Sequence, residues 1–198
     1  MTSPEELAAA ERGSVVAAAG CGKTELLARS VAAATGRQLV LTHTNAGVEA
    51  LRRRLRHWGV SNDRSAVDTI AGWCLKYILA FPGRSGGMPV NPNGSTNWPA
   101  IYPAMTALVR AGIVRKVLDA SYSGAFVDEY QDCDEAQHSL ISALTEILPV
   151  RILGDPLQAV FRFAGDPPPW FDSVEVKFPR IGTLGTPWRW QRVAGGRA

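Results

Sequence analysis

Residues 17–24 read AAAGCGKT, and they constrain the fold of this chain more than any other stretch. The apolar run over residues 15–19 predicts a short buried strand, and apolar residues at helical spacing after Thr24 predict a helix that ends near Gly36. A strand, a glycine-containing turn, a Lys-Thr pair and a helix together direct backbone N–H groups toward a phosphate. The alternative is a glycine-rich turn that only links a strand to a helix, but both flanking elements stand where a phosphate-binding loop needs them.

In that interpretation the backbone of the turn, from Ala19 through Gly20 and Cys21 to Gly22, surrounds the phosphates of a nucleotide. Lys23 then reaches the β- and γ-phosphates, and the Thr24 hydroxyl binds Mg²⁺. Such a site needs a second metal contact and a base, which must come from elsewhere in the chain.

Elsewhere the pattern alternates between short apolar runs and amphipathic segments. The apolar runs predict strands at residues 37–42, 66–69, 124–127 and 150–153, and the amphipathic segments predict helices at 4–12, 46–58, 69–78, 102–119 and 132–147. This alternation predicts an α/β fold with a mainly parallel sheet that helices cover on both faces. Motifs at the carboxyl ends of the strands are then expected to line one crevice.

Composition excludes several classes of protein. The chain has 198 residues, and its 21 basic and 18 acidic side chains give a net charge of +3, which does not by itself indicate a nucleic-acid-binding protein. Three widely spaced cysteines indicate reduced thiols rather than a disulfide framework. The first residues lack the basic start and apolar stretch of a signal peptide, and no window has the apolar length of a membrane span. We therefore expect a cytoplasmic protein with no membrane partner.

The segment at 46–58 leaves one alternative open. The helix at 46–58 is expected to bury Val48, Leu51, Leu55 and Trp58 on one face. Residues 52–54 are all arginine, which is typical either of a solvated face or of a surface that contacts phosphates.

Acidic and amide side chains follow two of the predicted strands. Asp128 and Glu129 come directly after residues 124–127, where Asp128 is placed to hold Mg²⁺ and Glu129 to orient the attacking water. Gln158 follows the strand at 150–153, where it can sense the γ-phosphate. Asp132 with Glu135 has the form of a helix start, so Asp132 has the alternative interpretation of a helix cap.

Six segments in order resemble the motifs of UvrD/Rep/PcrA-type superfamily 1 DNA helicases. The loop at 17–24 is similar to their A-G-A-G-S-G-K-T form, and residues 128–132 (DEYQD) resemble their DE-x-Q-D box. Residues 154–161 (GDPLQAVF) resemble G-D-x-x-Q-x-I-Y. Weaker likenesses are those of 41–45 (LTHTN) to motif Ia, of 69–72 (TIAG) to T-F-H-[GS], and of 184–189 (LGTPWR) to L-x-x-N-Y-R.

The resemblance implies the first RecA-like domain of such a helicase, a P-loop NTPase that hydrolyses ATP with Mg²⁺ and moves along single-stranded DNA or a single-strand/duplex junction. It implies catalytic roles for Asp128, Glu129 and Gln158, an arginine finger at Arg189, and adenine stacking by Trp188. It also implies a 3′→5′ direction. The resemblance further implies DNA contacts, which would come from Thr42, His43, Asn45, Thr69 and Phe163, although Phe163 has the alternative interpretation of a core residue.

The domain organisation follows from the same comparison. We expect the RecA-like domain at 1–81 and 121–180. A short helical insertion at 82–120 interrupts it, and we interpret this insertion as a reduced accessory subdomain. Residues 181–198 would form an edge segment that leads to a second RecA-like domain, in cis or supplied by a partner in trans. Two alternatives remain open, a non-catalytic nucleotide-binding regulatory module and a half-motor completed by a partner.

Overall fold

The computed structural model describes residues 2–84, 96–158 and 168–185. Its first half contains α1 (Pro4–Ala9), β1 (Arg12–Ala17), α2 (Lys23–Ala33), β2 (Gln38–Thr42), α3 (Asn45–His57), β3 (Ser65–Thr69) and α4 (Ile70–Ala80). There follow α5 (Trp98–Arg110), α6 (Arg115–Ser121), β4 (Gly124–Val127), the short helix η1 (Tyr130–Asp132) and α7 (Glu135–Leu144). The last elements are β5 (Val150–Gly154), η2 (Pro156–Gln158), η3 (Trp170–Val174), α8 (Glu175–Lys177) and β6 (Arg180–Leu184).

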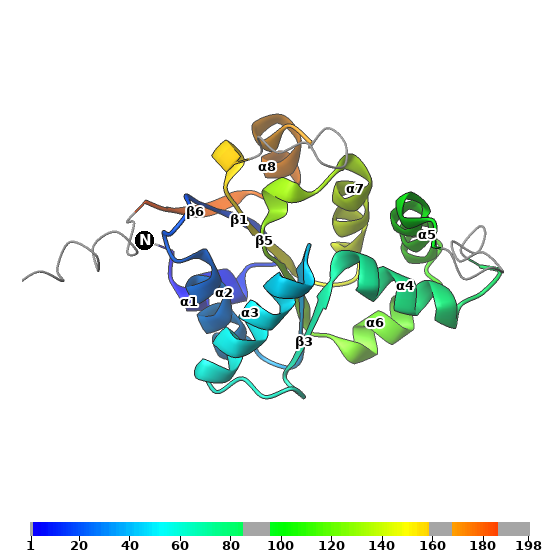
Figure 1. The fold of residues 1–198 in the computed structure, drawn as a ribbon, viewed down its shortest axis with the longest axis horizontal. Helices are drawn as coiled ribbons and strands as arrows, with labels where there is room; N and C mark the ends of the chain where they lie inside the picture. Colours follow the sequence, from blue (N-terminus) through cyan, green and yellow to red (C-terminus); the bar gives the residue numbers. More distant parts are fainter. Residues whose placement is uncertain (1, 85–95, 159–167, 186–198) are drawn as a thin grey trace, which may run out of the picture.

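The six strands form one sheet in the order β3-β2-β4-β5-β1-β6, and every recorded pairing is parallel. Helices lie on both sides of it, with α1, α2 and α3 on one side and α4, α5, α6 and α7 on the other (Figure 1). Parallel neighbours need crossover connections, which these helices supply. The predicted α/β, RecA-like class with a mainly parallel sheet is confirmed.

Two separate apolar cores lie on the two faces of the sheet. Because successive side chains of a strand point to opposite faces, Val40 packs with α2 and α3, whereas its neighbours Leu39 and Leu41 pack with α4. Strands buried on both faces are apolar at almost every position, which explains why β2 and β4 read as uninterrupted apolar runs. The strands are thus held rigidly, and their carboxyl ends give a fixed platform for the loops that follow.

The helical segments from the predicted insertion pack into one of these cores. Buried side chains of α5 and α6, among them Leu108 and Leu118, belong to the same cluster as Trp73 of α4 and Leu140 of α7. The helix α5 begins at Trp98, earlier than the predicted residue 102, with Pro99 in its first turn, where a missing N–H costs nothing. The division into four segments stays a prediction.

One alternative interpretation and one expectation about the helices are wrong. Asp132 does not cap α7, because Asp134 does so in a capping box. The Asp134 carboxylate accepts the N–H of Gln137 at 2.8 Å, and the side-chain oxygen of Gln137 accepts the N–H of Asp134. Trp58 does not lie on the buried face of α3, since the helix ends at His57 and the Trp58 side chain is 39% exposed.

The expected helix at 132–147 is also shorter in the structure, because α7 ends at Leu144 and a turn leads on to Pro149. Among the described residues, none of the helices combines the length and the apolar character needed to cross a bilayer.

Candidate nucleotide-binding site

The turn between β1 and α2 has the backbone geometry of a phosphate-binding loop. Gly20 and Gly22 have φ angles of 77° and 87°, a left-handed conformation that glycine adopts without a Cβ clash. Gly22 is the N-cap of α2 and offers no side chain to bond the first N–H groups of the helix. These N–H groups remain available to an anionic ligand at the positive end of the helix dipole. Cys21 is buried within the turn, and its N–H donates to the carbonyl of Ala18 at 3.1 Å.

Lys23 is the first residue of α2, and its ammonium forms an ion pair with the carboxylate of Glu129. The lysine is 8% exposed, so its charge lies at the inner wall of the site rather than on the surface. The sequence interval between the two residues is long, but β1 and β4 both flank β5, and their carboxyl ends meet at one edge of the sheet. The structure thus brings together two of the predicted site residues.

Glu129 is held in an unusual backbone conformation, since it is the one non-glycine residue with a positive φ, at 53°, in the part of the chain that the structure describes. Such a conformation costs on the order of 1–3 kcal/mol and is found most often at functional sites. Burial would raise the pKa of Glu129, but hydrogen bonds from Gln131 and Lys23 outweigh it, so the pKa lies below its usual value. The carboxylate is therefore ionised at neutral pH and 40% exposed toward the site.

Asp128 directly follows β4, precedes Glu129 in the sequence and is 5% exposed. Its carboxylate accepts the N–H of Glu129 at 3.0 Å. Burial, together with the neighbouring charge of Glu129, raises the pKa of Asp128 to about 6. A buried carboxylate with a raised pKa gains from a cation, because a positive charge nearby restores the ionised form.

Gln131 and Asp155 connect the loop after β4 to the loop after β5. Gln131 donates to the Glu129 carboxylate at 2.8 Å, and its carbonyl oxygen accepts the N–H of Asp155 at 2.9 Å. The Asp155 carboxylate in turn accepts the N–H of Ala19 at 3.1 Å and the amide of Gln158 at 2.8 Å. One continuous network therefore joins the β1–α2 turn, the acidic pair and Gln158.

Sequence reasoning did not assign roles to Gln131 and Asp155. Both lie inside the motifs quoted for the family resemblance, within three residues of Glu129 and Gln158, and they are 6% and 4% exposed. Their position just after the strands predicted at 124–127 and 150–153 was the available signal, since the carboxyl ends of parallel strands line one crevice.

The candidate DNA-contacting residues at the ends of β2 and β3 differ in their accessibility. The Thr69 hydroxyl accepts the N–H of Gly72 at 3.0 Å and so caps α4, and Thr42 is buried. Asn45 is exposed, and His43 is partly exposed with its Nε2 3.7 Å from the sulfur of Cys133. Burial lowers the pKa of His43, although the charge of Asp132 acts in the opposite direction. Of these residues, His43 and Asn45 offer polar side chains at the surface.

Three predicted site residues, Phe163, Trp188 and Arg189, lie outside the described residues. In the arginine run, Arg52 pairs with Glu49 at 2.9 Å and Arg54 pairs with Glu25 at 2.9 Å. Both pairs are exposed, as expected of a solvated helix face.

The oxygen atoms of Asp128 and Thr24 suit a Mg²⁺ ion that is bound together with a nucleotide. Mg²⁺ usually binds through one or two protein ligands plus phosphate oxygens and water rather than in a cage of side chains. In the described part of the chain, His, Cys, Asp and Glu side chains do not gather in groups of three that could hold a metal. Asp128 and Thr24 are the residues that would hold the ion, and the free N–H groups at the start of α2 fit the phosphates.

Comparison with known protein families agrees with the motifs over part of the chain. Among curated proteins no match was found. A structural match is the helicase nonstructural protein 10 of an arterivirus, solved in complex with DNA, with 16% sequence identity and a TM-score of 0.49. That match covers 87% of this chain but 35% of the viral chain, so the present chain spans about a third of that protein's length. The family model of the UvrD/REP helicase N-terminal domain matches residues 99–179, which confirms the resemblance to this family that the sequence motifs indicated.

Proposed function

We propose that this chain is the ATP-binding domain of a UvrD-like helicase, which hydrolyses ATP with Mg²⁺ and couples hydrolysis to movement along single-stranded DNA. The observation that carries the proposal is the network from Lys23 through Glu129, Gln131 and Asp155 to Gln158. It joins a phosphate-binding turn, a hydrolytic carboxylate and a candidate γ-phosphate sensor at one edge of the sheet.

Asp128 and Thr24 would hold Mg²⁺, which when bound would supply positive charge beside the phosphate oxygens. Lys23 would exchange its bond to Glu129 for the phosphates. Glu129, then released from the lysine, orients the attacking water and accepts its proton. Gln131 keeps the Glu129 carboxylate in place, since its bond does not depend on Lys23.

Coupling to DNA would pass through Gln158, whose bond to Asp155 changes when it contacts the γ-phosphate. DNA contacts would come from His43 and Asn45 at the surface, and from Thr42, Thr69 and Phe163 as the family resemblance implies. Arg189 and Trp188 would serve as arginine finger and adenine-stacking residue. A second RecA-like domain, in cis or in trans, would complete the charge clamp, and movement would be 3′→5′ in the cytoplasm.

The test is ATP hydrolysis by the purified chain with Mg²⁺, with and without oligo(dT). We expect slow hydrolysis that oligo(dT) stimulates, and we expect Glu129→Gln to lower it by about a hundredfold or more, the usual contribution of a general base. Glu135→Gln is the matched control, because Glu135 is exposed at the start of α7 and should not affect the rate. Nucleotide binding with no measurable hydrolysis in the unaltered chain would instead favour a regulatory module.

A further inference from the structure

Strand β3 is the outer strand of the sheet, and among the described residues one side of its backbone has no strand partner. It pairs in parallel with β2, in the register that sets Gln38 opposite Ser65 and Val40 opposite Val67. The N–H of Gln38 donates to the carbonyl of Arg64 at 2.9 Å. Since backbone groups of successive strand residues alternate in direction, Ala66 and Asp68 also face β2, and Ser65, Val67 and Thr69 face outward.

Side chains satisfy some of these outward groups. The guanidinium of Arg52 donates to the carbonyl of Val67 at 3.0 Å, and the carboxylate of Asp68 accepts the N–H of Thr69 at 2.9 Å. Within the described ranges, no bond is recorded for the outward N–H groups of Ser65 and Val67. The bond from Arg52 occupies the carbonyl of Val67, and it shows that a donor can reach β3 from outside the sheet.

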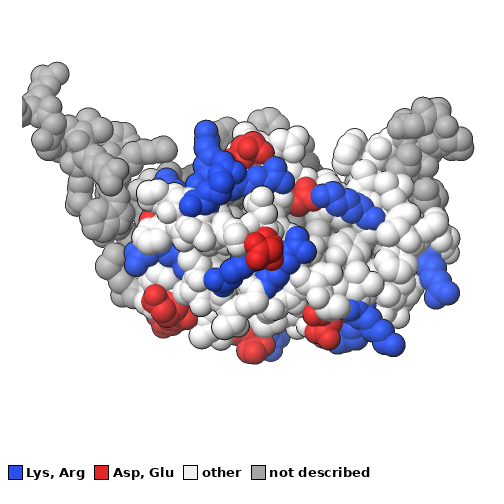
Figure 2. All heavy atoms as spheres, turned by 90° about the horizontal axis from the view of Figure 1, so that it is seen from below, with Lys and Arg blue, Asp and Glu red and all other residues white. Residues whose placement is uncertain are grey.

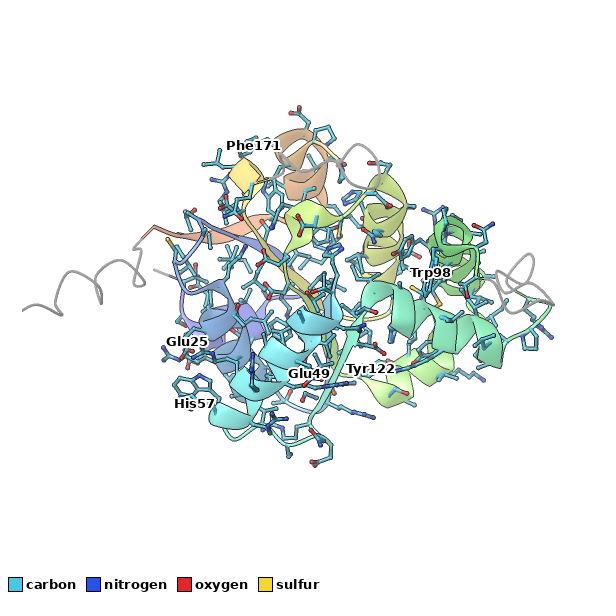
Figure 3. All side chains as sticks on the ribbon, in the orientation of Figure 1. Glu25, Glu49, His57, Trp98, Tyr122 and Phe171 are labelled. Carbon is cyan, nitrogen blue, oxygen red and sulfur yellow. The ribbon has the colours of Figure 1, made fainter. Side chains whose placement is uncertain are left out.

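A groove of about 860 Å³ runs along this edge. One wall comes from α3 and includes Glu49, and the other comes from α4 and the end of α6 and includes Tyr122; Figure 3 labels Glu49 and Tyr122 on the two sides of β3. Apolar and aromatic side chains line the groove, among them Leu39, Leu55, Val60, Trp73 and Tyr77. Helical layers of both faces therefore extend past the last strand, which leaves room for a further strand at the usual spacing of about 4.8 Å.

The rim of the groove carries a net positive charge. It contains Arg37, Arg52, Arg56 and Lys76, against the carboxylates of Glu49 and Asp68. Arg52 pairs with Glu49 and Lys76 pairs with Asp68, whereas Arg37 and Arg56 have no ion pair recorded within the described ranges. Figure 2 presents the molecule from this side and shows basic side chains gathered over its central part, with fewer acidic ones between them.

We propose that this groove binds an extended, acidic segment of a partner protein, which adds to β3 as a seventh strand. Backbone groups of the segment would pair with the outward N–H groups of Ser65 and Val67 and would replace Arg52 at the carbonyl of Val67. Alternate apolar side chains would fill the lined interior, and carboxylates would meet Arg37 and Arg56. A nucleic acid fits less well, because it cannot form strand-type backbone pairing with β3.

The probe is a fluorescein-labelled peptide of about seven alternating Glu and Val residues, long enough to span β3. Its binding to the chain is measured by fluorescence anisotropy beside a Lys-Val peptide of the same length and a labelled oligo(dT). We expect the Glu-Val peptide to bind and the Lys-Val peptide to bind at least about tenfold more weakly, because like charges oppose it at the rim.

Two variants with matched controls locate the binding. Val67→Pro removes an outward N–H without breaking a bond to β2, and Arg56→Glu reverses a charge at the rim. Each should weaken binding of the Glu-Val peptide about tenfold. Val67→Ala keeps the N–H and should weaken binding much less than Val67→Pro does. Arg53→Glu reverses a charge on α3 outside the groove and should leave binding unchanged. Thermal unfolding checks that the variants fold. If Val67→Pro does not fold, the effect of Arg56→Glu on peptide binding decides the test.

Three outcomes would overturn the proposal. One is absence of Glu-Val binding, and another is Glu-Val binding that Arg56→Glu leaves unchanged. The third is oligo(dT) binding that weakens with Arg56→Glu and displaces the peptide, which would make the groove a nucleic-acid site.

Discussion

Replacing Gln131 with leucine removes the link between the two loops that carry the acidic residues. The side chain is 6% exposed, donates to the Glu129 carboxylate at 2.8 Å, and accepts the N–H of Asp155 at 2.9 Å. Leucine has a similar volume and forms neither bond. The substitution therefore tests the hydrogen bonds and leaves no large cavity.

The expected cost can be estimated from the two bonds. A hydrogen bond to a charged group contributes about 1.5–3 kcal/mol, and a buried N–H left without a partner costs about 1–3 kcal/mol. Because the Glu129 carboxylate is partly exposed and water can replace one bond, we expect a loss of about 3 kcal/mol in the free energy of unfolding. That is a large fraction of the roughly 5–15 kcal/mol that holds a typical domain folded.

Urea unfolding and ATP hydrolysis are measured on Gln131→Leu and on Gln137→Leu. Gln137 is 7% exposed and bonds the N–H of Asp134 in the cap of α7, so its loss should cost about 1 kcal/mol and leave hydrolysis unchanged. In Gln131→Leu hydrolysis should fall at least about tenfold at temperatures where the variant is fully folded, because Glu129 loses its support. Equal effects of the two substitutions on stability and hydrolysis would refute the reasoning.

Three further predictions concern stability in the absence of Mg²⁺ and nucleotide. Because burial raises the pKa of Asp128 to about 6, the folded chain binds more protons than the unfolded chain between about pH 4 and pH 6, and the free energy of unfolding should fall by about 3 kcal/mol as the pH rises through this range. Urea titrations of Asp128→Asn should lack that decrease, and an unchanged slope would contradict the assignment. Asp134→Ala should lower the free energy of unfolding by about 1 kcal/mol and Asp132→Ala by less than about 0.5 kcal/mol, since Asp134 caps α7. The reverse order in chemical denaturation would contradict the assignment of the cap to Asp134. Gly154→Ala should cost about 1–3 kcal/mol, because its Cβ would lie 2.6 Å from the Trp170 ring; an unchanged melting temperature would show that the ring moves aside.

Much of the fold and the nucleotide site could be predicted from the sequence because the signals are local. Strand β4 is an apolar run that ends in Asp128 and Glu129, and parallel topology brings such strand ends to one edge. The proximity of Lys23 and Glu129 follows from that rule, whereas their ion pair is seen only in the structure. The capping box of α1, formed by Ser3 and Glu6, is equally local, because the two residues lie within one turn of each other.

Other features depend on contacts between distant segments, which a pattern cannot specify. Asp132 and Asp134 both stand before α7, and only the three-dimensional path of η1 decides which of them caps it. Trp58 fits the apolar spacing of α3, but the helix ends before it, and the ring lies instead beneath Arg29 at 5.1 Å. The groove at β3 combines walls from helices far apart in sequence, so no single stretch indicates it.

Titration of the chain with ATP in the presence of Mg²⁺, followed by calorimetry, tests the central claim most directly, since the claim is that residues 17–24 form a nucleotide site. The account predicts saturable binding to one site, and it predicts that Lys23→Ala weakens binding by about tenfold or more, equivalent to about 1.4 kcal/mol. Absence of ATP binding, or the same affinity in Lys23→Ala, would contradict it.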